Sequence, residues 1–279
     1  MKLLVLPAAL AALALSSGAQ DLPRPSPLGK VQQVVGLTNV SVEYSRPGVK
    51  GRKIFGELVP LNEMWRLGAN KCTRIEFDTP LMIEGQEVKA GAYSVFATPG
   101  PELWVITLNS NIELSGTEGY KPEEDVFAVK VAPGECEFTE TLTFEFQDVK
   151  DDKARLDIRW ENTRVSLWIG ADATKQGIAN IAEALAKPDV KFGAYSSSAR
   201  FYVDRGLDAK QALAWAEKSV SMERKYWNTH TLALAQAANG MYKEAIMTAQ
   251  ESMKLAEEAK APESVKNNKT KIEEWTAKL

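Results

Sequence analysis

The chain of 279 residues is poor in the side chains that most metal centres and nucleophilic active sites require. It has one histidine, His230, and two cysteines, Cys72 and Cys136. A zinc or iron site built from several histidines is therefore excluded, and so is a cluster held by four cysteines. A Ser-His-Asp or Cys-His site would have to use His230. We interpret His230 as an ordinary residue on the face of a helix.

Several other features of enzymes and nucleic-acid binders are missing. The chain has no Gly-x-Ser-x-Gly elbow and no phosphate loop ending in Gly-Lys-Ser/Thr. Its 34 basic and 37 acidic residues give a net charge of -3, without the basic excess typical of nucleic-acid binders. Two acidic groups, Glu123–Asp125 and Asp148 with Asp151 and Asp152, lack the calcium-loop spacing. We expect solvated turns there, although carboxylates alone could hold a metal, and we expect no cofactor and no nucleic-acid partner.

The first nineteen residues have the layout of a secretory signal peptide. Lys2 supplies a positive charge, Leu3–Leu15 is apolar, and Ser17-Gly18-Ala19 offers small residues for a cut after Ala19. The apolar run is shorter than the ~20 residues that span a membrane. We therefore predict a signal peptide over 1–19 and an exported protein, periplasmic or extracellular, without a transmembrane anchor in the mature chain. A buried core helix is the alternative.

Export would permit a disulfide between Cys72 and Cys136. Such a bridge could stabilise the fold by about 4 kcal/mol in the chain-entropy model. Two cysteines carry no spacing pattern that identifies a bridge, so two separate thiols are the alternative.

The first half of the mature chain has the period of β-strands. Residues 20–30 contain three prolines and predict an extended leader. From residue 31 to residue 170, apolar and polar residues alternate, as in Asn39–Tyr44, and turn signals separate the runs. Eight to ten short strands without interleaved helices predict an all-β domain over 31–170, an antiparallel sandwich or barrel. The last two runs, 156–160 and 165–169, are separated by a few residues and should form a hairpin.

From residue 171 the apolar spacing changes to three and four, which predicts an all-α domain over 171–279. Gly206–Ala212 aligns with Gly240–Ala245 at a period of 33 to 34 residues. This period resembles the tetratricopeptide repeat, although the early Trp and the terminal Pro of that pattern are missing. We expect a short tetratricopeptide-like helical stack leaning on the β domain. An unrelated bundle of four or five helices is the alternative.

The densest polar region of the chain lies in two loops of the β half. Four cations fall within residues 46–53, and glycines there would let the backbone approach a ligand. Arginine suits carboxylate, sulfate and phosphate groups. The candidate binding residues are Tyr44, Arg46, Lys50, Arg52, Trp65, Arg66 and Asn70. They form either an anion-binding site or a structural set in which the arginines pair with buried acids or carbonyls; we favour the structural role.

Specific sequence blocks in this region resemble a known family. They read EYSRPGVKGRKIFGELVP, WRLGANKCTRIEF, KAGAYSVFATPG and WVITLN. Over residues 26–148 the chain is similar to the domain-of-unknown-function 2911 family of secreted bacterial proteins. The resemblance implies an exported β domain with a shared loop core, and no activity. Cys72 stands where that family usually has a small residue, so the resemblance does not support a disulfide.

Together these features favour a non-enzymatic binding or scaffolding protein of the cell envelope, whose helical domain contacts another envelope protein. One alternative is a hydrolase that uses arginine, asparagine and carboxylates of the loop cluster. A deep pocket joining the loop arginines would favour it. The other alternative is a small-anion or glycan binder with Trp65 and Trp104 as stacking faces.

Overall fold

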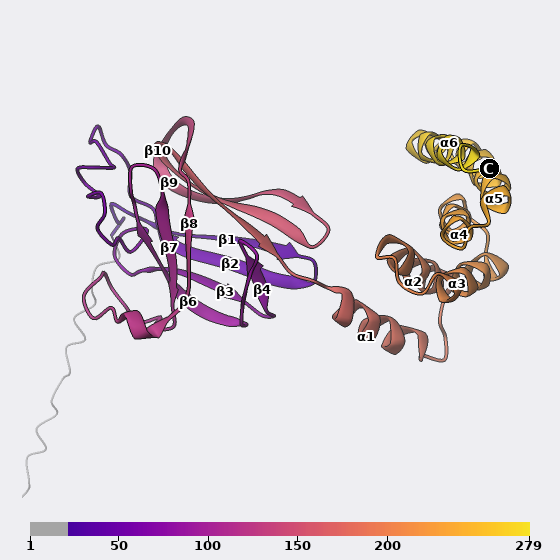
Figure 1. The fold of residues 1–279 in the computed structure, drawn as a ribbon, viewed down its shortest axis with the longest axis horizontal. Coiled ribbons are helices and arrows are strands. Elements are labelled where there is room, and N and C mark those ends of the chain that lie inside the picture. Colours follow the sequence, from indigo (N-terminus) through magenta and orange to yellow (C-terminus); the bar gives the residue numbers. More distant parts are fainter. Residues whose placement is uncertain (1–21) are drawn as a thin grey trace, which may run out of the picture.

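The computed structural model describes residues 22–279, which form a β domain and a helical domain joined end to end (Figure 1). The predicted signal peptide, 1–19, lies outside the described residues. The extended leader is shorter than predicted, because the first strand already begins at Leu28. The predicted fold class is confirmed: antiparallel sheets occupy 28–170, and six helices follow between residues 174 and 276.

Ten strands form two antiparallel sheets, and side chains from both sheets share one core. The six-stranded sheet has the order β1 (Leu28–Val35), β2 (Thr38–Ser45), β3 (Thr73–Phe77), β6 (Gly91–Thr98), β7 (Trp104–Asn109), β8 (Asp125–Val131). The four-stranded sheet has the order β5 (Gln86–Val88), β4 (Leu81–Ile83), β10 (Lys153–Gly170), β9 (Gly134–Lys150). A single turn of 3-10 helix, Pro122–Glu124, precedes β8. Of the two predicted architectures, the chain therefore adopts the sandwich.

The alternation in the sequence explains which face of each strand is buried. In β2, Val40, Val42 and Tyr44 are at most 2% exposed, whereas the alternating residues Asn39 and Glu43 are exposed. Each buried aliphatic or aromatic side chain of this kind contributes about 1.5–3 kcal/mol to folding relative to an exposed one. The core between the sheets thus follows from the period of two.

The predicted hairpin between 156–160 and 165–169 is wrong. Both runs belong to β10, one strand of 18 residues that pairs with β9. Glu161 has a left-handed φ of 56°, and the register with β9 shifts on both sides of it. On each side of Glu161, two residues along β10 correspond to four along β9, so the pairing is bulged and the extra residues lie on β9. The buried hydrophobic positions of β10 change from even numbers before Glu161 to odd numbers from Val165 onward, and both sets belong to the same core.

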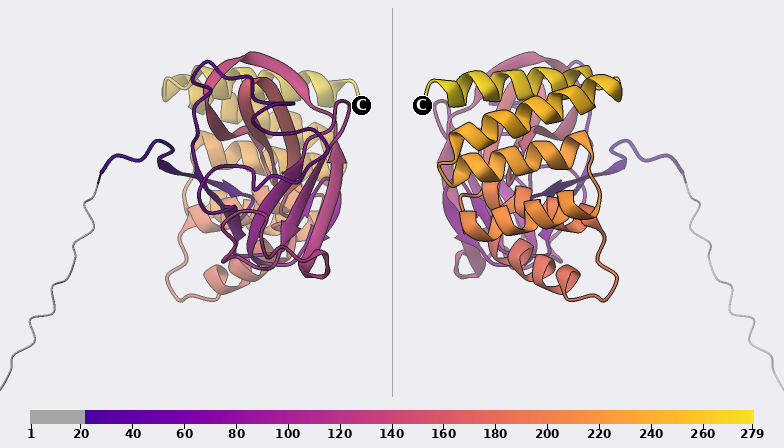
Figure 2. Two further views of the ribbon diagram at one scale, coloured as in Figure 1. Left: turned by 90° about the vertical axis from the view of Figure 1, so that its left-hand side faces the viewer. Right: turned by 90° about the vertical axis from the view of Figure 1, so that its right-hand side faces the viewer.

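The helical domain is a row of stacked helices. They are α1 (Thr174–Leu185), α2 (Phe192–Asp204), α3 (Ala209–Met222), α4 (Tyr226–Ala238), α5 (Tyr242–Glu258) and α6 (Pro262–Thr276). Each helix packs on the next, and in addition α2 contacts α4 and α4 contacts α6. Figure 2 shows the row from the side of the helical domain. In Figure 1, α2, α4 and α6 lie on the side that faces the β domain, with α3 and α5 behind them.

Polar contacts recur along this row with the period seen in the sequence. Ser219 of α3 donates to the carbonyl of the first residue of α2 at 2.8 Å, and Ser252 of α5 donates to the equivalent carbonyl of α4 at 2.7 Å. Asn228 then donates to Ser219, and Asn268 to Ser252, each at 3.0 Å. All four side chains are 0% exposed. The repeat of 33 residues between the two serines is therefore a repeat of interhelical contacts.

Candidate functional site

The two domains are joined by an ion pair between Arg205, at the end of α2, and Asp152, in the turn between β9 and β10. The two terminal nitrogens of Arg205 donate to the two carboxylate oxygens of Asp152, both at 2.7 Å. Arg205 also donates to Thr174 Oγ1 at 2.8 Å and lies 4.7 Å from the centre of the Phe201 ring. The side chains of Arg205 and Asp152 are 22% and 20% exposed. A two-point, partly buried pair of this kind fixes the orientation of the two side chains relative to each other and also contributes to stability.

Asp152 also holds the start of the interdomain segment. Its backbone carbonyl accepts from Ala171 N at 2.8 Å, and its carboxylate accepts from Ala173 N at 3.2 Å. Gly36, in the turn between β1 and β2, packs against the same segment with a φ of 60°. A Cβ atom at Gly36 would lie 2.6 Å from the Ala171 carbonyl oxygen. The acidic turn that we expected to be merely solvated is thus the junction of the two domains.

A hollow of about 490 Å³ lies on the face formed by α2, α4 and α6. Its lining includes Arg200 and Asp204 from α2, Trp227 and His230 from α4, and Ser264 and Asn267 from α6. Trp227 is 39% exposed and stacks on Phe192, with ring centres 5.4 Å apart. The hollow therefore combines an exposed aromatic surface with hydroxyl, amide and charged groups.

His230 lies in this hollow, held by a buried amide. Its Nδ1 is 2.8 Å from Asn268 Oδ1. The Asn268 nitrogen donates to Ser252 and to the Ser264 carbonyl, so Oδ1 is the acceptor and His230 Nδ1 carries the proton. Burial lowers the pKa of His230, and the hydrogen bond to Asn268 opposes that effect. The ring is consequently neutral at pH 7.

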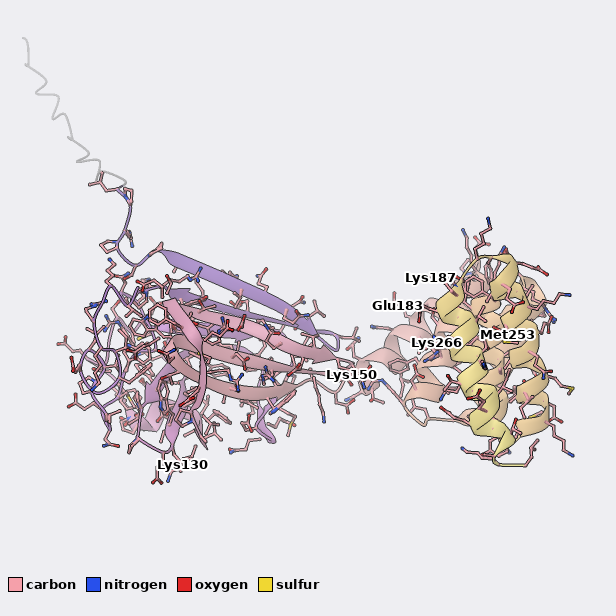
Figure 3. The ribbon with its side chains drawn as sticks, turned by 90° about the horizontal axis from the view of Figure 1, so that it is seen from above. Lys130, Lys150, Glu183, Lys187, Met253 and Lys266 are labelled. Carbon is pink, nitrogen blue, oxygen red and sulfur yellow. The ribbon has the colours of Figure 1, made fainter. Side chains whose placement is uncertain are left out.

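A second hollow, of about 950 Å³, lies between α1 and α2 and reaches the turns of the β domain. Ser197, Arg200, Phe201 and Asp204 line both hollows. The two hollows therefore adjoin along α2, and together they are called the groove below. Figure 3 places Lys150, at the end of β9, in the narrow region between the domains. Glu183 on α1 and Lys187, two residues after the end of α1, lie beyond it.

The loops between β2 and β3, which carry the predicted candidate arginines, lie at the end of the β domain that points away from the helices (Figure 1). Arg46 donates to the Leu142 carbonyl at 3.2 Å and to Thr143 Oγ1 at 3.0 Å, both on β9. Arg52 donates to carbonyls of its own loop, those of Val49 at 3.0 Å and Gly48 at 2.6 Å. These contacts give Arg46 and Arg52 internal acceptors of the kind that a structural role requires.

The aromatic members of the predicted cluster pack inside the β domain. Tyr44 is 2% exposed, and its hydroxyl accepts from Phe144 N at 3.0 Å. Trp65 stacks on Trp160, with ring centres 5.7 Å apart and an angle of 21°. Trp104, the other predicted stacking face, is 3% exposed and therefore cannot offer a face to a glycan.

The other predicted loop residues, Lys50, Asn70 and Arg66, do not share hydrogen-bond partners with one another. Lys50 has an exposed side chain, and its backbone N donates to Glu140 Oε1 at 2.9 Å. Asn70 donates to Ser45 Oγ at 3.2 Å. Arg66 has a buried Nε without a hydrogen-bond partner, and within residues 22–279 it forms no ion pair. Arg66 thus lacks the internal acceptors that Arg46 and Arg52 have.

The cysteines are free thiols, so the possible bridge between Cys72 and Cys136 is not formed. Cys72 is buried and donates to the Gly116 carbonyl at 3.3 Å, and burial raises the pKa of its thiol.

The acidic group of Asp148, Asp151 and Asp152 pairs with arginines, since Asp148 contacts Arg155 and Asp152 contacts Arg205. Throughout residues 22–279, no three acidic, histidine or cysteine side chains are grouped to hold a metal. In the same part of the chain, no helix has the length and apolar character needed to cross a membrane.

Reasoning from the sequence missed the groove, although the repeat contained a signal for it. Ser196 and Ser197 stand 34 residues before His230 and Thr231, and all four line the smaller hollow. Equivalent positions of α2 and α4 therefore point to the same side. The partner of Arg205 had no such signal, because Asp152 lies 53 residues away in the other domain.

Comparison with known proteins identifies the β domain. No curated protein matches the chain, and no solved structure does. The model of a family described as "Protein of unknown function (DUF2911)" matches residues 26–169. The match covers more than half of the chain, includes all ten strands to within one residue, and ends before α1. The chain belongs to the DUF2911 family.

Proposed function

We propose that this chain is an exported, non-enzymatic binding protein of the cell envelope. Its helical domain would hold a segment of a partner protein on the face of α2, α4 and α6. The hollow of about 490 Å³ on that face carries the proposal, because three helices contribute to it and it combines the exposed Trp227 with polar side chains. Stacked helical repeats characteristically bind partners on such extended surfaces.

The arrangement of the helices supports the interpretation of the helical domain as a tetratricopeptide-like array. The serine and asparagine contacts recur, and Ala212 and Ala216 in α3 match Ala245 and Ala249 in α5, all 0% exposed. Small residues at these positions let neighbouring helices approach closely. The polar α6 resembles the capping helix that ends such arrays. At the other end, Arg205 binds Asp152 of the β domain, a contact that would help to stabilise an array with fewer than the usual three repeats.

The chemistry of the hollow supports binding in preference to catalysis. His230 Nδ1 is engaged by Asn268, and no hydrogen bond joins His230 to a serine, threonine or cysteine within residues 22–279. A nucleophile and its base need such a bond. The signal-peptide layout of residues 1–19 supports export.

Site-specific photo-crosslinking in the cells that produce the protein tests this proposal. A photoreactive phenylalanine analogue would replace Trp227 in one variant and Met247, 62% exposed on α5, in the matched control. We expect a discrete crosslinked protein from position 227 and none from position 247. Equal crosslinking from both positions, or none from position 227, would contradict binding on the face of α2, α4 and α6.

A further inference from the structure

The two domains are joined by a short segment, residues 171–173, and by the ion pair between Arg205 and Asp152. We infer that this junction is a hinge. Its pivot is formed by Asp172 and Ala173, and the Arg205–Asp152 pair is a latch that holds the helical domain in its present position. The hinge does not depend on the proposed binding function, because it concerns only how the helical domain is held relative to the β domain.

Within residues 22–279, the two domains share no apolar core. The core of the β domain ends at Ala171, and the apolar clusters of the helical domain begin at Ala199. Strands pack extensively on strands and helices on helices, whereas no described strand packs extensively on a helix. Figure 3 shows the resulting narrow region between the domains. Domains without a large apolar interface move relative to each other unless specific contacts hold them.

The pivot consists of the two residues between the core of the β domain and α1. Ala171 is part of that core, and its N donates to the Asp152 carbonyl at 2.8 Å, so it belongs to the β domain. Thr174 begins α1, and its N donates to Asp172 Oδ1 at 2.8 Å. The side chain of Asp172 is 78% exposed. Because the chain passes between the domains only here, rotation at Asp172 and Ala173 would turn the helices that follow.

The latch is a second connection, made by side chains. Arg205, at the end of α2, donates two hydrogen bonds to the Asp152 carboxylate, both at 2.7 Å. It also donates to Thr174 Oγ1 at 2.8 Å, so it ties both α1 and α2 to the β domain. The same carboxylate accepts from Ala173 N of the pivot at 3.2 Å. A rotation of the helical domain therefore has to break the contacts between Arg205 and Asp152.

The other charges around the latch offset one another. Lys150 and Lys153 flank the turn between β9 and β10, and Lys175 lies in the first turn of α1. Asp151 in the same turn and Asp172 in the pivot supply the opposite charge. The surroundings therefore give no strong attraction between the domains as a whole, and the two-point pair is the specific contact that holds them. Removal of one charge of the pair is the direct way to open the latch.

The hinge also controls the larger hollow, of about 950 Å³. The walls of this hollow come from both sides of the pivot. Gly36 and Leu37 lie in a turn of the β domain, whereas Asn180 and Ile181 lie on α1. Rotation at the pivot would move these walls relative to each other, so the size of the hollow follows the position of the helical domain. The hollow thus has its present shape only while the latch is closed.

Distances between spin labels, measured by double electron–electron resonance, test the hinge in the mature full-length protein. Gln147→Cys on β9 and Lys266→Cys on α6 carry one pair of labels across the junction, at exposed positions. Lys218→Cys on α3 with Lys266→Cys carries a control pair within the helical domain. All chains contain Cys72→Ala and Cys136→Ala, which remove the free thiols. We expect one narrow distance distribution from each pair, and a broad distribution across the junction would overturn the latch.

Substitutions on both sides of the latch should release the hinge. Arg205→Gln and Asp152→Asn each remove one charge, and asparagine keeps an acceptor oxygen for Ala173 N. We expect each to widen the distribution across the junction at least about twofold and to leave the control pair unchanged. Arg200→Gln, which breaks an exposed pair with Asp204 on the same helix, is the matched control and should resemble the parent.

The double variant Arg205→Gln/Asp152→Asn distinguishes a latch from two separate effects. If the two residues form one latch, either substitution already opens it, so the double variant should be no broader than the broader single variant. Additive broadening, unchanged single variants, or equal broadening in Arg200→Gln would overturn the latch. Equal broadening of the control pair would show unfolding of the helices in place of rotation and would overturn the hinge. No partner takes part in these measurements, so they are independent of the crosslinking at Trp227.

Discussion

Arg205 of α2 and Asp152 of the turn between β9 and β10 form a two-point ion pair, with both contacts at 2.7 Å, across the boundary of the two domains. The pair also orders the segment that follows β10, because the Asp152 carboxylate accepts from Ala173 N. The pair is thus one of the contacts that hold α2 against the β domain, and both of its residues line the larger hollow.

Removal of this arginine should loosen the junction. Arg205→Ala leaves the partly buried Asp152 carboxylate without its partner, so we expect a loss of about 1–3 kcal/mol in the free energy of unfolding. Limited proteolysis of the variant should release a fragment of about residues 28–170 faster than it does from the parent. Arg200→Ala, which breaks an exposed pair with Asp204, is the control and should cost less than about 1 kcal/mol. Equal losses in the two variants would show that the junction does not depend on Arg205.

Asn228 and Asn268, which form equivalent interhelical contacts, should contribute equally to the stability of the helical domain. Asn228→Ala and Asn268→Ala each remove the donor to a buried serine and to a backbone carbonyl. We expect each substitution to lower the free energy of unfolding by about 1–3 kcal/mol. Asn267→Ala, at the exposed neighbouring position, is the matched control and should melt like the parent. Thermal melts followed by far-ultraviolet circular dichroism measure the three variants. A loss confined to one of the two buried asparagines would argue against equivalent contacts.

The stability of the helical domain should depend on pH through His230. Burial lowers the pKa of His230 from its ordinary 6.5, so the folded state binds a proton less readily than the unfolded state. The stabilisation is present above pH 6.5 and is lost as the pH falls from there through the folded-state pKa. Denaturant unfolding between about pH 7.5 and pH 5.5 should show this loss in the parent and a smaller one in His230→Gln. The same pH dependence in both proteins would assign the effect to other groups.

Arg46 and Arg66 should differ in how much they stabilise the β domain. Arg46→Ala removes two hydrogen bonds to β9 and should cost about 1–3 kcal/mol. Arg66→Ala removes a charge without an internal partner and should cost less. If Arg66 takes an external anion, tens of millimolar sulfate should raise the melting temperature of the parent by mass action and that of Arg66→Ala by less. Identical sulfate effects in the two proteins would remove Arg66 as an anion site.

The left-handed backbone at Glu161 in β10 predicts an unusual tolerance for glycine inside a strand. Glu161 has a φ of 56°, which glycine adopts freely and β-branched residues do not. We expect Glu161→Gly to leave the free energy of unfolding unchanged or raise it by up to about 1 kcal/mol, and Glu161→Val to lower it by about 1 kcal/mol or more. Urea denaturation of both variants measures the difference. A Glu161→Val variant more stable than the parent would show that the strand pairing does not need a left-handed residue at this position.

Local patterns in the sequence were enough to predict the two domains and their order. A period of two in Asn39–Tyr44 and a spacing of three and four in Ile178, Ile181 and Leu185 reflect the geometry of one strand or helix against one core. The hairpin prediction failed for the same reason. A turn and a bulge share local residue preferences, and only the partner strand β9 decides that β10 continues past Glu161.

The sequence by itself determined the classes of the elements, the boundary near residue 170, the helical repeat and the exclusion of histidine- or cysteine-rich metal sites. The tertiary structure alone decided the pairing of Arg205 with Asp152, the meeting of α2, α4 and α6 around His230, and the internal acceptors of Arg46. The physical reason is the range of the interactions. Periodicity records which side of an element is buried, whereas these contacts join residues distant in the chain that meet only after the elements have packed.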